Sequence, residues 1–481
     1  MCSQRTRRET RLYVAGEWRG GASTMSVTDL ATGGQLADVA TADESIVDDA
    51  LTVAEETEPA LAAASIPERV EWVSEIAAGL ADRRADLAET IAREAGKPIV
   101  SARSEVDSAV ERFERASEEI RALFGEYREG TTASHDGWRA IVAHEPVGTV
   151  LCVAPFNYPL ATLALQVAPA LAVGNAVVVK PSSRTPLSAL GLARAVEESP
   201  VPDGALHVLP GRSSQIGDAL AGDERVETIA MTGSTRAGKA VADEAGLTTL
   251  HMELGGNAPA IVFEDADLDA VAADVASGAL SFAGQRCSAV SRVLVVEQVR
   301  DELVDRIDAA VHGWTVGDPL DDETDLGPLI SGSQARFVQE LVDDAVSRGA
   351  HIRCGGTYTE DPEGVFYYEP TFIADVPRDA RLVREEQFGP VLPVSTVDSV
   401  ADAVALCNDG DLALDASVYT ADYDRALSVA DRVDAGTVRI NGAPSHGIGD
   451  VPFGGNENSG IGREGLYTAI EDYVRRKSII L

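Results

Sequence analysis

Residues 147–180 read VGTVLCVAPFNYPLATLALQVAPALAVGNAVVVK, and this stretch decides the fold class. An apolar β-rich run ends at Ala154, a helical pattern covers Leu160–Ala172, and a second apolar run covers Ala176–Val179. Alternation of this kind is typical of parallel strands that are joined by helices packed on the sheet. Because the same alternation continues to about residue 245, the sequence predicts an α/β fold with a doubly wound parallel sheet.

A second alternating set of strands and helices begins near Ala258 and runs to about Ile440, so two α/β domains are expected. Between Asp43 and Leu123, apolar and charged residues recur at spacings of three and four, which predicts helices. The last residues, Asp472–Leu481, read as a strand without an obvious sheet of its own. Such a strand favours pairing with another subunit, and a homodimer or homotetramer is expected.

The acidic surplus of the sequence limits the possible partners. The 481 residues include 40 Lys and Arg against 78 Asp and Glu, a formal net charge of −38. The acidic residues are spread along the whole chain, which indicates a solvated acidic shell of the kind expected in a high-salt, halophilic cytoplasm, where ions screen self-repulsion. Nucleic-acid binding is excluded, because it requires a basic face.

Cysteine usage and hydropathy favour a reducing cytoplasm. The five cysteines are widely spaced and form no Cys-x-x-Cys pair, so neither a disulfide framework nor a metal site is expected. No signal peptide is expected, because the basic N-terminus is not followed by an apolar stretch. The longest apolar region, Leu160 to Val179, is interrupted by Gln166, Pro169 and Gly174, so no membrane span is expected.

One cysteine and one glutamate suggest covalent catalysis. Cys287 stands in residues 282–288 (FAGQRCS), and a cysteine in a glycine-containing turn beside a cation is a candidate thiolate nucleophile. Glu253 ends a predicted strand in residues 252–257 (MELGGN) and is a candidate general base. The alternative for Cys287 is the commoner role of a lone cysteine, an inert buried apolar residue.

Other candidate residues lie at the ends of predicted strands, where open α/β sheets bind ligands. Asn157 either directs its side-chain NH₂ at a developing oxyanion or only shapes a Pro-rich turn. Lys180 either binds ribose hydroxyls and phosphate or is a plain surface lysine. Gly233 and Ser234 start a helix that could hold a pyrophosphate, although Gly-Ser-Thr is also an ordinary N-cap. Glu386 could bind a nicotinamide ribose or belong to an ordinary loop.

In their joint order these motifs resemble the aldehyde dehydrogenase superfamily over essentially the whole chain. The most specific are Glu-Leu-Gly-Gly-Asn at 253–257 and Gly-Gln-x-Cys at 284–287. His144–Gly148 and Phe156–Pro159 look most like the branch of non-phosphorylating glyceraldehyde-3-phosphate dehydrogenases and lactaldehyde dehydrogenases. The resemblance implies a Rossmann-like dinucleotide-binding domain (1–123 and 146–253), a catalytic domain (254–445), and a small β oligomerisation element with the C-terminal strand (124–145 and 446–481).

The resemblance implies oxidation of an aldehyde to the carboxylic acid with NAD or NADP. Cys287 would attack the carbonyl, and the Asn157 side chain and the Cys287 N–H would hold the oxyanion. Hydride transfer would leave a thioester, which water activated by Glu253 would hydrolyse. The implied cofactor groove consists of Pro155, Phe156, Lys180, Ser182, Ser183, Gly211, Gly217, Gly233, Ser234, Glu386 and Phe388.

One departure from the family pattern favours NADP as cofactor. NAD-preferring relatives commonly have a glutamate three positions after the ribose-binding lysine, and Ser183 occupies that position here. The serine removes a charge that would repel the 2′-phosphate of NADP, and Arg184 is adjacent. Use of NAD, or of both cofactors, stays open.

A second departure concerns the substrate. Phosphate-specific relatives gather several arginines around the phosphate; Arg286 matches one, whereas Ser108 and His446 occupy the positions of two others. One arginine and one histidine make a weak phosphate site. A small hydroxyaldehyde (lactaldehyde or glyceraldehyde) or another short-chain aldehyde is therefore expected, with glyceraldehyde 3-phosphate and succinate semialdehyde as alternatives. The expected pocket consists of Tyr158, Arg286, Ser288, His446 and Phe453.

Two other functions fit part of the pattern. A cysteine hydrolase would use Cys287 and Glu253 without a dinucleotide, but Lys180 and the helix start at Gly233 argue against it. A relative that has lost activity would be expected to lack Cys287, Glu253 or Asn157, and all three are present.

Overall fold

The stretch that predicts the fold class forms β7 (Thr149–Val153), α5 (Ala161–Val173) and β8 (Ala176–Lys180). The computed structural model describes residues 9–445 and 451–481. Every residue of α5 is buried, which explains why this helix is apolar on all sides. β7 and β8 pair in parallel, so the predicted parallel α/β sheet is confirmed.

The parallel strands of the first sheet reverse their order next to β7. β8 and β9 (Leu206–Val208) lie on one side of it, whereas β10 (Val226–Thr232) and β11 (Thr249–Glu253) lie on the other. The carboxyl ends of β7 and β10 therefore flank the crevice where open α/β sheets bind ligands. The antiparallel strands at the two edges of this sheet are β1 (Leu12–Val14), β2 (Glu17–Arg19) and β23 (Gly460–Ile461).

Helices form where the periodicity predicts them. The region between Asp43 and Leu123 forms four helices, and Gly96-Lys97-Pro98 separates the third from the fourth. The Asp43 side chain accepts a hydrogen bond from the Ile46 N–H (3.0 Å), which satisfies a backbone donor at the first helix start. The helices of this lobe, in addition to α5, are α1 (Glu44–Ala63), α2 (Ile66–Asp82), α3 (Arg84–Ala95), α4 (Ile99–Ala122), α6 (Pro186–Glu197), α7 (Ser213–Ala221), α8 (Thr235–Glu244) and α15 (Leu466–Asp472).

The second alternating region forms a second, mainly parallel sheet in the order β14-β17-β18-β13-β12-β20-β21. Ile261 and Leu294 pack in one apolar cluster and their neighbours Val262 and Val293 in another, so both faces of this sheet are buried. Its strands are β12 (Ala258–Val262), β13 (Val290–Val296), β14 (His351–Cys354), β17 (Thr371–Ala374), β18 (Val391–Val397), β20 (Asp415–Tyr419) and β21 (Thr437–Ile440). Its helices are α9 (Leu268–Leu280), α10 (Arg300–Val311), α11 (Gly332–Ser347), α12 (Arg381–Arg384), α13 (Val400–Cys407) and α14 (Tyr423–Ala430).

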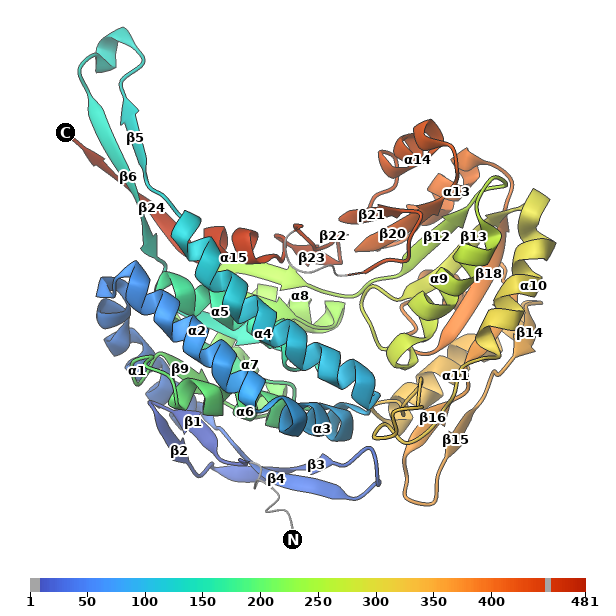
Figure 1. Cartoon of the computed structure of the whole chain (residues 1–481), viewed down its shortest axis with the longest axis horizontal. Coiled ribbons are helices and arrows are strands. Elements are labelled where there is room, and N and C mark those ends of the chain that lie inside the picture. Colours follow the sequence, from blue (N-terminus) through green and yellow to red (C-terminus); the bar gives the residue numbers. More distant parts are fainter. Residues whose placement is uncertain (1–8, 446–450) are drawn as a thin grey trace.

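Short strands complete the two lobes, and Figure 1 shows the lobes side by side, with α4 running along the first towards the second. The two-stranded sheets are β3 (Ser23–Thr28) with β4 (Gln35–Thr41), β15 (Tyr358–Glu360) with β16 (Phe366–Tyr368), and β19 (Leu412–Ala413) with β22 (Asn456–Glu457). Among the described residues, no helix combines the length and apolar character that a membrane crossing requires.

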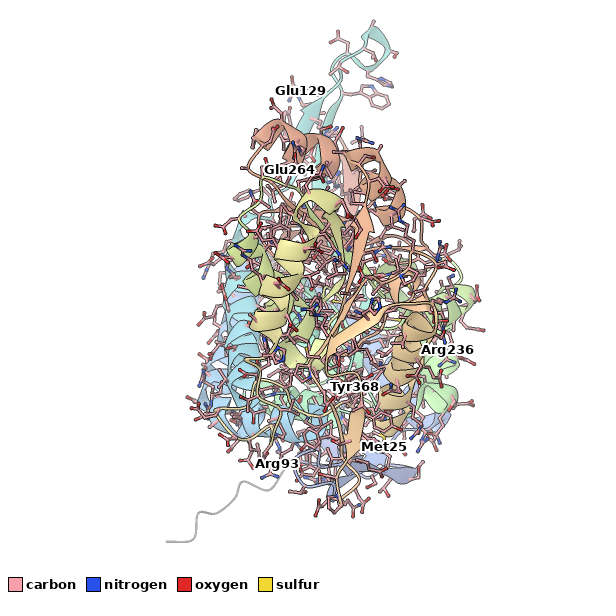
Figure 2. All side chains as sticks on the ribbon, turned by 90° about the vertical axis from the view of Figure 1, so that its right-hand side faces the viewer. Met25, Arg93, Glu129, Arg236, Glu264 and Tyr368 are labelled. Atoms are coloured by element: carbon pink, nitrogen blue, oxygen red, sulfur yellow. The ribbon has the colours of Figure 1, made fainter. Side chains whose placement is uncertain are left out.

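A three-stranded arm projects from the first lobe (Figure 1). It consists of β5 (Glu126–Glu129), β6 (Arg139–Pro146) and β24 (Val474–Ile480), in the order β24-β6-β5. Seen from the second lobe, Glu129 on the arm lies at the opposite end of the molecule from Met25 (Figure 2).

The arm corrects one expectation. The C-terminal strand has a sheet within its own chain, because β24 pairs antiparallel with β6 from Val474 opposite Pro146 to Ile480 opposite Ala140. Strand patterns in the sequence do not show which strands pair, so the partnership of β24 with β6 could not be predicted. β24 remains an edge strand, and its outer edge pairs with no described strand of the chain.

Candidate active site

A cavity of about 900 Å³ lies at the carboxyl ends of the strands of the first sheet and is closed on its other side by the second lobe. Asn157, Glu253 and Cys287 all line it, although they come from three separate parts of the chain. Most of the other residues expected at a cofactor or substrate site line it as well. These are Pro155, Phe156, Tyr158, Lys180, Ser182, Ser183, Gly233, Ser234, Arg286, Ser288, Glu386 and Phe388.

Three of the expected site residues that the structure describes, Gly211, Gly217 and Phe453, are not among those that line this cavity. Gly211 is buried beside α7, and a side chain there would place its Cβ 2.8 Å from Ile216, so packing explains this glycine. Gly217 lies within α7, and Phe453 is 3% exposed and pairs its backbone with Glu464. His446 lies outside the described residues.

A left-handed turn presents Cys287 to the cavity. After α9 the backbone passes through Phe282, Ala283 and Gly284 with φ values of 54°, 52° and 68°. A Cβ at Gly284 would lie 2.1 Å from the Gly389 carbonyl oxygen, so only glycine fits there. Two non-glycine residues in this region of backbone space are costly, which indicates that the surrounding structure fixes the turn.

Asn157 is held against the same turn. Its side chain is 5% exposed, and its Nδ2 donates a hydrogen bond to the Gln285 carbonyl oxygen (2.9 Å). The Gln285 side chain in turn accepts from the Ile330 N–H (2.8 Å). Because an amide NH₂ carries two N–H donors, this bond orients the group and leaves a second donor for a ligand oxygen beside Cys287.

Carboxylates, rather than a cation, dominate the surroundings of the thiol. Burial raises the pKa of Cys287 well above its usual range, and the nearby Glu253 charge and a hydrogen bond with Glu253 raise it further. The neighbouring Arg286 has another partner, since its Nη2 donates to the Pro444 carbonyl oxygen (3.4 Å). The thiol is therefore protonated near neutral pH, and Glu253 is placed to accept its proton.

The two glycines after Glu253 allow the lobes to approach each other. A Cβ at Gly256 would lie 2.3 Å from the Cys287 carbonyl oxygen, and one at Gly255 would lie 2.8 Å from the Glu386 carboxylate. The Gly256 N–H donates to Glu386 (3.0 Å). Burial and the Glu253 charge nevertheless raise the pKa of Glu386 to about 7.

Lys180 is a buried cation at the end of β8. Its side chain is 6% exposed, and burial lowers its pKa to about 8. No hydrogen bond or ion pair joins its ammonium group to another residue in the described part of the chain. Ser183, just beyond it, also lines a second cavity of about 190 Å³ together with Arg184 and Arg212.

The cofactor side of the cavity also contains a helix start. Ser234 is the N-cap of α8, and its hydroxyl accepts from the Ala237 N–H (3.3 Å). Gly233 and Ser234 line the cavity, so the N-terminal end of α8 faces it, as an anion site requires.

Sequence reasoning missed a buried ion pair that supports this site. Lys97 is paired with Glu105, each side chain is 1% exposed, and the Lys97 ammonium lies 3.6 Å from the Tyr158 ring centre. Glu105 also accepts from the N–H groups of Leu160 (3.0 Å) and Ala161 (3.2 Å), which anchors the loop that carries Asn157. The available signal was that Lys97 is one of only four lysines, but its Gly-Lys-Pro setting indicated merely a helix break.

A further residue that sequence reasoning missed is Arg112 of α4, which is 9% exposed and lines the cavity. The position of Arg112 inside a regular helical pattern gave no signal. The spacing of residues along a helix does not show whether a given arginine is buried in a cavity or exposed to solvent.

Comparison with known proteins identifies the family of this chain. The model described as "Aldehyde dehydrogenase family" matches residues 18–479. The chain is 37% identical to an NADP-dependent glyceraldehyde-3-phosphate dehydrogenase of Streptococcus equinus, covering 97% of this chain and 98% of that protein. It is 34% identical to a 3-sulfolactaldehyde dehydrogenase of Priestia megaterium, with 98% and 97% covered.

Among solved structures, one similar chain is the NADP-dependent glyceraldehyde-3-phosphate dehydrogenase from Bacillus halodurans C-125 complexed with NADP. The TM-score is 0.95 at 34% identity, and 99% of each chain is covered. The sequence match over nearly the whole chain and the shared fold lead to one conclusion: this chain belongs to the aldehyde dehydrogenase family.

Proposed function

We propose that the protein oxidises a short-chain aldehyde to its carboxylic acid with NADP, using Cys287 as nucleophile. The observation that carries this proposal is that Cys287 and Glu253, whose charge acts on the thiol, line one cavity together with the fixed Asn157 amide.

In the proposed reaction Glu253 takes the proton of the Cys287 thiol, and the thiolate attacks the aldehyde carbon. The Asn157 N–H and the Cys287 backbone N–H stabilise the negative charge on the former carbonyl oxygen. NADP, when bound, accepts the hydride that leaves this carbon. Glu253 passes the thiol proton to solvent, so that it is again a base. It then removes a proton from the water that attacks the thioester, and this proton returns to the departing Cys287 sulfur, which releases the acid and restores the thiol.

The preference for NADP over NAD is supported by the residues beyond β8. Lys180 and Glu386 are proposed to bind the two riboses, since both lie in the cavity with buried charges or acceptors. Beyond Lys180, the smaller cavity is lined by Ser183, Arg184 and Arg212. Glu94 lines it too, but its carboxylate accepts from the N–H groups of Leu187 and Ser188, so the two guanidinium groups would favour a 2′-phosphate. NAD remains the alternative cofactor.

Small hydroxyaldehydes such as lactaldehyde and glyceraldehyde are one proposed class of substrate, because Ser108 provides no charge and Arg286 is one guanidinium. An aldehyde with an anionic group is the second candidate. The names of the Streptococcus and Priestia relatives refer to phosphorylated and sulfonated aldehydes, and a buried arginine described below favours this class.

Self-association through the arm is also proposed. The outer edge of β24 pairs with no strand among residues 9–445 and 451–481, and Phe124, Tyr127 and Trp138 are at least half exposed on or beside the arm. Exposed apolar residues beside a free strand edge are typical of an interface between subunits. The acidic shell and the free cysteines support a location in a high-salt, reducing cytoplasm.

The test is a panel of short neutral and anionic aldehydes offered with NADP and with NAD in molar KCl, with Cys287→Ala beside the wild type. Reduction of NADP by the wild type and its loss in Cys287→Ala are expected. Turnover that survives in Cys287→Ala would show that the nucleophile is another residue.

A further inference from the structure

One face of α4 forms a wall of the cavity and ends in a positive charge. Ser101, Ser104, Ser108 and Arg112 follow one another at helical spacing and all line the cavity. Their exposure falls along the helix: Ser101 and Ser104 are exposed, Ser108 is partly buried and Arg112 is 9% exposed. Small hydroxyl side chains thus lead inward from the surface to a buried guanidinium.

No hydrogen bond or ion pair connects the Arg112 guanidinium to another residue within the described ranges 9–445 and 451–481. A buried arginine offers five N–H donors and normally has them satisfied. Burial accordingly lowers the pKa of Arg112, although the charges of Glu464, Glu105 and Glu253 act in the opposite direction.

The neighbouring carboxylates are engaged elsewhere. Glu105 is paired with Lys97, Glu464 accepts from the Thr232 hydroxyl (2.9 Å), and Glu253 has its hydrogen bond with Cys287. They lower the electrostatic cost of burying Arg112 but do not occupy its N–H groups. A ligand in the cavity can therefore still use this donor set.

We infer that Arg112 determines specificity by binding, together with Arg286, the anionic end of the aldehyde substrate, an inference that rests on the proposed function. Both arginines line the cavity that holds Cys287. The ligand class is an aldehyde with a terminal carboxylate, phosphate or sulfonate, since all three present oxygens that match a planar guanidinium. Arg112 lies one helical turn beyond Ser108 and so supplies from the next turn the charge that Ser108 lacks.

The competing explanation is structural, with Arg112 serving only to balance the charges of Glu253 and Glu464. That role would affect every substrate equally, because the charge of Glu253 matters for each aldehyde. A ligand-binding role affects only anionic substrates and acts mainly on KM.

The experiment compares matched substrate pairs: glyceraldehyde 3-phosphate with glyceraldehyde, and succinate semialdehyde with butanal. For Arg112→Met, kcat/KM for the anionic member is expected to fall at least about 30-fold, mostly through KM, while the neutral member stays within about threefold. Arg112→Lys should recover part of the loss. The control is Arg103→Met on the same helix, because Arg103 is paired with Asp322 and does not line the cavity.

The two pairs separate a phosphate from a carboxylate preference. Three results would overturn the role of Arg112: equal losses for both members of a pair, no loss for either member, or a wild type that favours the neutral member of both pairs. Should the Met variant fail to fold, two other measurements test the role of Arg112: the kinetics of the Lys variant, and inhibition of the wild type by succinate or inorganic phosphate. Absence of such inhibition would count against the inference. A wild type that oxidises no aldehyde with either cofactor would instead refute the proposed function itself.

Discussion

At the level of single residues, the thiol of Cys287 depends on a neighbouring base. Burial and, after it, the surrounding carboxylates raise its pKa, so a free thiolate is scarce at neutral pH. Glu253 thus has two tasks in the proposed reaction, accepting the thiol proton first and a water proton later. This differs from a cysteine activated by a cation, which the adjacent Arg286 suggested in the sequence.

Glu253→Gln tests both tasks. We expect kcat to fall by about 10² or more, because a general base is lost. The first-turnover burst of reduced cofactor should be slow at neutral pH and become faster as the pH rises, since the thiol then deprotonates without help. Rapid mixing with absorbance detection of NADPH measures this, and Cys287→Ala should show no burst at any pH. A normal burst at neutral pH would assign the first proton transfer to another group.

Ser183→Glu tests the cofactor preference. A carboxylate beside Arg184 and Arg212 would repel a 2′-phosphate, so the ratio of kcat/KM for NADP to that for NAD should fall about tenfold or more. Steady-state kinetics with both cofactors measures the ratio. Ser428→Glu, on the exposed side of α14, adds the same charge away from the cavity and should leave the ratio unchanged. A wild type that strongly prefers NAD would contradict the assignment.

Residues that belong to sequence-local motifs could be placed in the site from sequence, and those that act through tertiary packing could not. Cys287, Glu253, Asn157 and Lys180 stand at strand ends or turns, where the chain order of the motifs indicates a shared edge. Arg112 could not be placed in this way. Its role depends on which side of α4 faces the cavity and on the lack of a partner for its guanidinium group among the described residues.

At the level of elements, the strand–helix–strand unit of β7, α5 and β8 was predicted almost to its bounds, whereas β14 and β17 of the second sheet were not predicted individually. α5 illustrates why: its apolar run is flanked by Pro159 and Gly174, and the latter adopts φ 91° at the helix end. The partner of β24 was not predicted, since β6 lies more than 300 residues away in sequence and alternation carries no pairing information.

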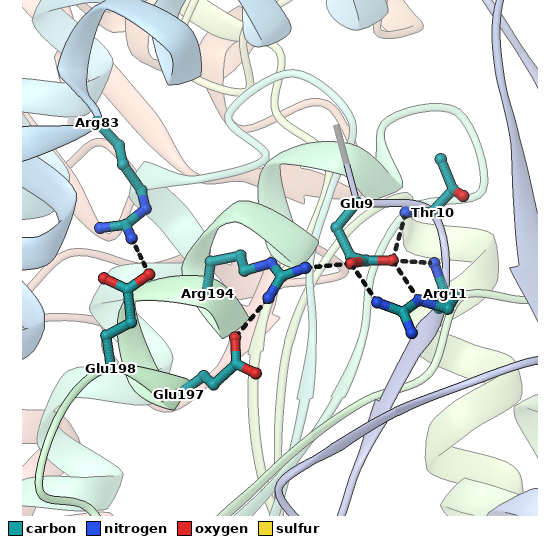
Figure 3. A network of polar contacts seen from close by, with 7 residues as sticks. All are labelled: Glu9, Thr10, Arg11, Arg83, Arg194, Glu197 and Glu198. Carbon is teal, nitrogen blue, oxygen red and sulfur yellow. Dashed lines mark hydrogen bonds and ion pairs between the residues drawn. The ribbon is translucent and has the colours of Figure 1, made fainter. Parts of the chain in front are cut away.

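The first strand is tied to α6 by an ionic network (Figure 3). Glu9 accepts hydrogen bonds from Arg11 and is paired with Arg194, which also contacts Glu197. Burial alone would raise the pKa of Glu9, but hydrogen bonds from the Arg11 side chain and the Arg11 and Thr10 N–H groups lower it to about 2.

Because the folded-state pKa of Glu9 is depressed, its stabilising effect is present above the ordinary value of 4.5 and is lost as the pH falls towards 2. Glu9→Gln should therefore lower Tm by roughly 2 °C at neutral pH. Its difference from the wild type should shrink as the pH falls below 4.5. Calorimetry across this range measures it, and a difference that grows on acidification would contradict the assignment. Glu17→Gln, in an exposed pair with Arg19, is the control.

At the level of the whole molecule, the surplus of acidic residues governs stability. With a net charge of −38, the folded chain repels itself, and salt screens that repulsion. Tm should rise by several degrees between low and molar KCl. Sucrose at equal osmolarity is the control, because an uncharged osmolyte stabilises proteins by its exclusion from their surface and does not screen charges. A Tm that stays flat across the salt series would refute adaptation to high salt.

The thiol and its base belong to different sheets, since Glu253 ends β11 of the first and Cys287 stands before β13 of the second. Neither lobe by itself contains a reactive pair. The turnover rate therefore depends on the relative orientation of the two lobes. A small rotation of one lobe would separate the Cys287 sulfur from the Glu253 carboxylate while every strand stayed intact. Because a chain with a net charge of −38 needs salt to screen self-repulsion, we expect activity to fall at low salt before the strands and helices unfold.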